Sequence, residues 1–141
     1  MTAALRQRTR GRWRDLGAGL AALMALWAWA GAVGIAGGGI DFGPVITSRL
    51  PWQSTWLAAC ALAAGVAVPM SAAALLGVRR SPAAPPALMT AGLLLVGWIA
   101  AQLVFIRTFS WLQPVCAGYG LVLTLIAART RRHDSTDRER T

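Results

Sequence analysis

The sequence predicts an all-α protein, an integral membrane bundle of four transmembrane helices. Of its 141 residues, 56% are hydrophobic and only 13% are charged, whereas soluble domains carry about 25% charged residues. The charges gather at the two ends and in one short turn, and they leave long uncharged blocks between them. We therefore expect one transmembrane domain at 16–128, preceded by a basic cytoplasmic arm at 1–15 and followed by a disordered cytoplasmic tail at 129–141.

The first two spans are predicted at 16–37 and 55–78. A secretory signal peptide is the alternative for the first block, because an arginine-rich segment precedes it. Signal-peptide cores reach only about 15 residues, however, and this block is longer. The second block contains Pro69, which removes a backbone hydrogen bond and should kink its helix. We interpret both blocks as complete membrane-spanning helices.

The third and fourth spans are predicted at 87–106 and 113–128. The third is uncharged throughout, and a helix of about 20 residues crosses the ~30 Å hydrocarbon core of a bilayer. The fourth begins near Pro114, whose missing N–H costs little in the first turn of a helix. This last block is slightly short, so we expect Trp111 and Leu112 to extend it.

The loop at 38–54, between the first two spans, is unusually apolar. We expect it to lie on the membrane interface or to fold over the outer end of the bundle. Aromatic residues are expected to form a belt at the same interface. The members of this belt are Phe42, Trp52, Trp56, Phe109 and Trp111.

The positions of the basic residues predict the orientation of the chain. Twelve of the fourteen flank the spans on one side, at positions 6, 8, 10, 12, 14, 79, 80, 129, 131, 132, 138 and 140, and the other side holds Arg49 and Arg107. The positive-inside rule then places both termini in the cytoplasm, in a multi-pass protein of the inner (plasma) membrane. Anionic headgroups of the lipid bilayer are the expected partners of these arginines. Because the spans account for the basic excess, we do not expect nucleic acid as a partner.

The residues inside the spans argue against most catalytic classes. No Asp or Glu lies in a predicted span, so the carboxylate that proton-coupled transporters use is missing. The single histidine, His133, lies in the tail, which excludes a haem held by two span histidines. The cysteines form no C-x-x-C motif. We therefore expect a protein that is not an enzyme, with no cofactor and no metal site.

Five residues are candidate ligand contacts. Gln102 is the most conspicuous polar residue of the spans, and Trp98 lies four residues earlier on the same helix face. An amide in hydrocarbon seeks a partner, either on a neighbouring helix or on a ligand that enters from the outer leaflet. Tyr119 needs a partner for its hydroxyl if it is buried, and it either packs with that hydroxyl satisfied or shares a network with Gln102. Arg107 either pairs with Asp41, which would hold the loop over the bundle, or reaches toward headgroups.

Cys60 and Cys116 are candidate redox residues, since both are predicted near the outer ends of their spans. If the second and fourth spans touch there, the two thiols could form a disulfide. The alternative is that each cysteine acts as a small apolar side chain, as buried cysteines usually do.

Two segments resemble known proteins. The run from Ala91 to Val115, AGLLLVGWIAAQLVFIRTFSWLQPV, and the loop from Gly38 to Trp52 resemble small, uncharacterised four-span membrane proteins of actinobacterial type. A more distant similarity to the DoxX-like group rests on the number of spans and the glycine-rich first hairpin. The resemblance implies a four-span fold, and it implies no activity for this chain.

Three functions remain open from the sequence. The preferred one is a non-enzymatic accessory or assembly subunit of a larger membrane complex, with a membrane protein partner or a second copy of the chain. The first alternative is a small-molecule or lipid-binding protein, or a weak transporter, with a site in the outer leaflet. The second alternative is a thiol- or quinone-linked oxidoreductase.

Overall fold

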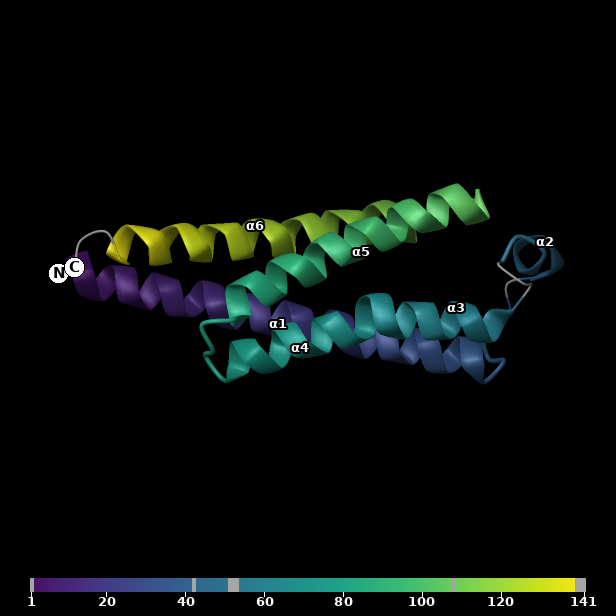
Figure 1. The fold of residues 1–141 in the computed structure, drawn as a ribbon, viewed down its shortest axis with the longest axis horizontal. Helices are drawn as coiled ribbons and strands as arrows, with labels where there is room; N and C mark the ends of the chain where they lie inside the picture. The colour runs from purple at the N-terminus through teal and green to yellow at the C-terminus, as the bar shows by residue number, and fades with distance from the viewer. Residues whose placement is uncertain (1, 42, 51–53, 108, 139–141) are drawn as a thin grey trace.

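The computed structural model describes residues 2–41, 43–50, 54–107 and 109–138, most of which are helical and none of which lies in a strand. The helices follow one another as α1 (Thr2–Ala36), α2 (Gly43–Thr47), α3 (Thr55–Leu62), the π-helical turn η2 (Ala63–Ala67), α4 (Val68–Val78), α5 (Ala84–Ile106) and α6 (Leu112–Arg138). The start of α1 and the end of α6 lie at the same end of an elongated bundle (Figure 1). We call this the basic end, and we call the opposite end the α2 end.

Four helical segments of the described chain are long and apolar enough to cross a membrane. They are Gly11–Ala36, Thr55–Val78, Ala84–Ile106 and Leu112–Arg132, and their lengths run from 21 to 26 residues. A helix of this length spans the ~30 Å core of a bilayer. The prediction of an all-α protein with four membrane-spanning helices is confirmed at this level.

The two terminal helices are longer than the spans that they contain. Helix α1 begins at Thr2, so the segment predicted as a basic arm continues the first span as a helix. Helix α6 continues to Arg138, whereas a disordered tail was predicted from residue 129. Arginine and alanine are good helix formers, and a helix already nucleated in a span propagates into such flanks. For residues 129–138, the predicted disorder is therefore corrected to helix.

Helix α5 begins earlier than its predicted span, because the proline-rich turn supplies its first residues. Pro85 and Pro86 occupy the first turn after Ala84, where neither an N–H nor a free φ angle is needed. The helix ends at Ile106, and Arg107 follows in the left-handed conformation with φ of 52°.

The second span is divided immediately before Pro69. Val68 donates its N–H to the carbonyl of Ala63, five residues back, which closes the π turn η2. Proline cannot donate to the carbonyl four residues earlier, that of Gly65. The distortion predicted at Pro69 is thus a π turn, which absorbs the missing bond within the helix.

Small residues bring the helix backbones close together in the core. A Cβ atom on Gly92 of α5 would lie 2.7 Å from the Gly120 carbonyl oxygen of α6, and one on Gly77 of α4 would lie 2.6 Å from the Ala18 Cβ of α1. Met70 and Leu123 belong to the same core and are fully buried. Such close approach favours helix association in membranes through packing.

The bundle is tight at the basic end and separates toward the α2 end. Helix α4 packs on both α1 and α5, and α5 packs along α6. Helix α3, by contrast, packs on α1 and hardly contacts α5 or α6. The hairpin of α5 and α6 accordingly diverges from α1 and α3 toward the α2 end (Figure 1).

Candidate functional site

A cavity of about 610 Å³ occupies the space between the two hairpins at the α2 end. Volumes of roughly 300–1,000 Å³ are usual for small-molecule sites. The lining comes from α1, the loop after α1, α3, η2, α5 and α6. It consists of Met24, Trp27, Ala28, Ala30, Gly31, Ile40, Ile46, Leu62, Val66, Leu95, Trp98, Ile99, Gln102, Ile106, Ser110, Leu112, Gln113 and Cys116.

The lining is amphipathic along its length. Its deeper part, toward the middle of the bundle, is formed by apolar side chains such as Met24, Val66 and Leu95. Its polar side chains lie near the α2 end and are Gln102, Ser110 and Gln113. The described lining residues include no charged side chain. The cavity can therefore receive a molecule with an apolar body and a neutral polar group.

Among the polar groups of the cavity, the Gln102 amide is available for a hydrogen bond to a ligand. It lies one turn before Ile106, the last residue of α5, and its side chain is half-buried. Within the part of the chain that the structure describes, the Gln102 amide forms no hydrogen bond. A primary amide has two donors and an acceptor, and leaving them unsatisfied among apolar groups costs free energy. The predicted bond from Gln102 to another helix is therefore not formed.

Gln113 has a structural task at the start of α6. The Ser110 N–H donates to the Gln113 Oε1 atom at 3.2 Å, and the Leu112 N–H donates to the Ser110 Oγ atom at 3.4 Å. This reciprocal arrangement is a capping box. Gln113 is almost completely buried, with 6% of its surface exposed. The sequence analysis missed this residue, although the pattern Ser-x-x-Gln before an apolar run could have indicated the cap.

Two indoles contribute to the cavity wall from different hairpins. Trp98 of α5 was predicted as a site residue, and its Cε3 atom lies 3.7 Å from a Cβ built on Gly65 of η2. Trp27 of α1 was not predicted as a site residue. It lines the cavity while 66% of its surface stays exposed.

The remaining predicted ligand contacts lie outside the cavity lining. The Tyr119 hydroxyl donates to the Leu20 carbonyl at 2.8 Å and so joins α6 to α1, without Gln102. The Asp41 Oδ1 atom accepts the Gly43 N–H at 2.8 Å, just before α2. Arg107 is exposed. Among the described residues no ion pair joins Asp41 to Arg107, and the structure therefore corrects that predicted pair.

A different arginine holds the loop that carries α2. The Arg49 Nη1 atom donates to the Ile106 carbonyl at 2.8 Å, at the C-terminus of α5. Ile40 and Ile46 of the same loop line the cavity. The loop therefore covers one side of the cavity and connects the first hairpin to the second. This arrangement agrees with the expectation of a loop folded over the bundle.

The predicted aromatic belt is described in part. Trp56, Phe109 and Trp111 are strongly exposed at the α2 end, where indole and phenyl rings suit a membrane interface. Phe42 and Trp52 lie outside the described residues.

The two cysteines are not paired. Both are free, Cys60 is exposed on α3, and Cys116 of α6 lines the cavity. The disulfide considered from the sequence is therefore not formed in this structure. Across the described residues no three His, Cys, Asp or Glu side chains gather in a group that could hold a metal ion.

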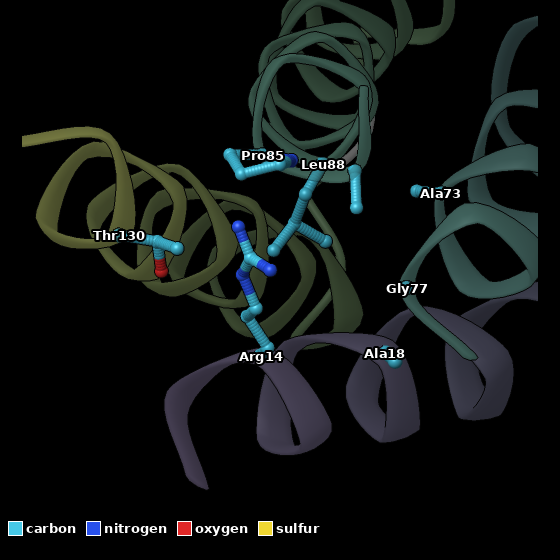
Figure 2. Close-up of a pocket in the computed structure, with 8 residues that line it drawn as sticks. Arg14, Ala18, Ala73, Gly77, Pro85, Leu88 and Thr130 are labelled. Atoms are coloured by element: carbon cyan, nitrogen blue, oxygen red, sulfur yellow. The ribbon is translucent and has the colours of Figure 1, made fainter. Parts of the chain in front are cut away.

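A second, much smaller pocket lies at the basic end, with a volume of about 20 Å³. Arg14 extends from α1 into it, toward Leu88 of α5 and Thr130 of α6 (Figure 2). A water molecule needs roughly 10–15 Å³ of such volume, so this pocket has room for little more than one. Nearby, the Arg129 guanidinium lies 5.7 Å from the centre of the Trp13 ring, a cation–π contact. We regard this pocket as part of the helix packing.

Comparison with known proteins adds no functional assignment. The chain matches no protein-family profile, no curated protein and no solved structure. The similarity to actinobacterial four-span proteins and to the DoxX-like group stays a prediction.

Proposed function

We propose that this protein binds an amphipathic small molecule or lipid in the cavity at the α2 end. The observation that carries the proposal is the Gln102 amide, which faces a large apolar cavity and has no hydrogen-bond partner among the described residues. A bound polar group would satisfy this amide. Apolar side chains such as Leu95 and Val66 would contact the remainder of the ligand.

We also propose how the chain is oriented and in which membrane it lies. In the sequence, twelve of the fourteen arginines belong to the two terminal segments and to the turn between α4 and α5, whereas Arg49 and Arg107 lie at the α2 end. The positive-inside rule favours a cytoplasmic location for the basic end and for both termini, in the inner (plasma) membrane. The cavity would then open in the outer leaflet, and its polar side chains would lie near the level of the headgroups.

The proposed role is binding, without a chemical step. The described lining offers two amides, a hydroxyl, a thiol and two indoles, and it contains neither a carboxylate nor an imidazole. General acid–base catalysis uses mainly those last two groups. A protein of this kind presents, stores or passes on its ligand.

Replacing Gln102 tests the proposal. Gln102→Leu removes the amide and retains the size and helix propensity of the side chain, so ligand binding should weaken about tenfold, as expected for one lost hydrogen bond. The measurement is the amount of co-purifying small molecule or lipid, by mass spectrometry of protein extracted from its membrane into nanodiscs. Thr90→Val, a polar-to-apolar change on the exposed face of the same helix, is the matched control. Equal retention by the two variants would count against the proposal.

The accessory-subunit role is our second proposal, and one observation favours it. Gly97 of α5 and Gly118 of α6 are exposed, with open space above their Cα atoms. Glycines on a lipid-facing surface allow a partner helix to approach closely. Crosslinking in native membranes, followed by mass spectrometry, should then recover one stoichiometric protein. Recovery of the monomer alone would contradict this role.

A further inference from the structure

The cavity lining also restricts the charge of the ligand, an inference that rests on the proposed binding function. An ionised headgroup inside the cavity would lose its hydration and meet no countercharge from the described lining residues. The nearest arginines at this end do not change this conclusion. Arg49, which keeps its charge when it donates to the Ile106 carbonyl, and Arg107 are both exposed and lie outside the lining, so a charged group would meet them only outside the cavity. The part of the ligand that enters the cavity is therefore uncharged.

The polar groups of the cavity restrict the functional group of the ligand. Part of the hydrogen-bonding capacity of Gln113 and Ser110 is used in the cap of α6. Gln102 has both donors and its carbonyl available within the described chain. An amide of this kind donates to a ketone, or donates to and accepts from a hydroxyl. A ketone or hydroxyl one helical turn below the end of α5 would satisfy it.

The indoles restrict the shape of the ligand. Trp27 enters the lining from α1 and Trp98 from α5, so aromatic surface is present on both hairpins. Trp98 lies beside Gly65 of η2, and a Cβ atom built on this glycine would make an ordinary van der Waals contact with the Trp98 Cε3 atom at 3.7 Å. Flat rings pack on indoles with offset or edge-to-face geometry, and a flexible acyl chain gains less from such walls. The aromatic surface thus favours a ring.

We propose that the ligand is an uncharged amphiphile whose flat ring bears a ketone or a hydroxyl. The ring lies between Trp27 and Trp98, its oxygen bonds to Gln102, and its apolar tail extends toward Met24 and Leu95. Isoprenoid quinones and hydroxylated polycyclic lipids share this chemistry. No electron transfer is part of the proposal.

Four amphiphiles, three of which carry the same ten-carbon chain, test the proposal on the full-length protein in phosphatidylcholine nanodiscs. Decylubiquinone and a sterol are uncharged and contain a ring. Monodecanoylglycerol is uncharged and has no ring, and decanoyl lysophosphatidylglycerol is anionic. Native mass spectrometry measures the bound fraction during titration. We expect saturable one-to-one binding of a ring ligand, at least about tenfold tighter than that of the other two. Gln102→Leu should weaken this binding about tenfold, and Thr90→Val should leave it unchanged.

The outcomes separate this inference from the proposed function. Selective binding of decylubiquinone identifies a quinone-type ring as the source, and selective binding of the sterol identifies a polycyclic lipid. Equal or tighter binding of the anionic or the ringless amphiphile overturns the inference and leaves the binding function standing. The inference is also overturned if Gln102→Leu binds the ring ligand as tightly as the natural chain. Absence of saturable binding by all four overturns the inference and the binding function together.

Discussion

Gln102 and Tyr119 each place a polar group inside an apolar bundle, and the structure uses them differently. The Tyr119 hydroxyl donates to the Leu20 carbonyl and links α6 to α1, whereas the Gln102 amide faces the cavity. A polar group with a partner adds to stability, while one without a partner subtracts from it. At the scale of the residue, one side chain serves the fold and the other is available for binding.

This difference predicts opposite effects on stability. Tyr119→Phe should lower the free energy of unfolding by about 1 kcal/mol, because one interhelical hydrogen bond is lost. Gln102→Leu should raise that free energy by up to about 1 kcal/mol in ligand-free protein, because an unsatisfied amide is removed. Thermal unfolding in mild detergent measures both changes. A destabilised Gln102→Leu variant would show that the amide has a structural partner.

At the scale of the element, the α5–α6 hairpin depends on two glycines that face each other. Thr124 and the Gly120 carbonyl occupy the space that a side chain on Gly92 would need, at 2.6 and 2.7 Å from its Cβ position. Backbone atoms cannot move aside as flexible side chains do. The pairing of these two helices is therefore set by the absence of a side chain.

A matched pair of substitutions tests this dependence. Gly92→Val should separate α5 from α6 and lower the free energy of unfolding by about 2–3 kcal/mol, as overpacked cores do. Gly97→Val introduces the same residue on the same helix, at a position with open space, and should change stability by less than about 0.5 kcal/mol. The measurement is the unfolding midpoint in detergent. Equal effects of the two substitutions would mean that propensity, not packing, dominates.

The described side chain of Arg49 joins the loop that carries α2 to the second hairpin by a hydrogen bond. Arg49→Ala removes the bond to the Ile106 carbonyl, so amide hydrogen exchange in residues 43–50 should become faster. The global unfolding midpoint should change little, because Arg49 is exposed. Arg107→Ala changes another exposed arginine at the same end and is the control. Loss of protection in both variants would indicate a charge effect and not a tether.

At the scale of the whole molecule, the two ends of the bundle differ in charge, packing and openness. The basic end is closed by α4, which contacts both α1 and α5, and the α2 end holds the cavity. Helices that separate toward one membrane face give a ligand access from one leaflet. The orientation of the chain therefore decides from which leaflet the proposed ligand would enter the cavity.

Single cysteines in a variant without Cys60 and Cys116 test this orientation. A membrane-impermeant maleimide should label Ser48→Cys, at the α2 end, in intact cells. It should label Ser81→Cys, in the turn between α4 and α5, only after the membrane is opened. The reverse pattern would place the cavity in the cytoplasmic leaflet.

Hydrophobicity and charge were sufficient to predict the four spans, because few structures other than a membrane-spanning helix suit a long uncharged block. They could not define the ends of α1 and α6, since the extent of a helix outside the membrane depends on the helix propensity of its residues. They could not select Arg49 over Arg107 as the tether, because both are basic residues on the same side. Of the residues that line the cavity, Gln102 and Trp98 were predicted as ligand contacts and Cys116 as a redox residue. The cavity itself depends on how two hairpins pack, which periodicity within one helix does not encode.

The π turn η2 has a consequence for chain length. A π turn holds one more residue than an α turn, so the residues after it are rotated by about 100° relative to a continuous helix. Leu62, which lines the cavity before the turn, and Met70, which is buried in the core after it, therefore belong to two halves of the second span that are rotated relative to each other. Deletion of one residue within 63–67 would make the second span a continuous α-helix, without this rotation between its two halves. The shortened chain would still span the membrane, but the side chains of its second span would no longer line the same cavity.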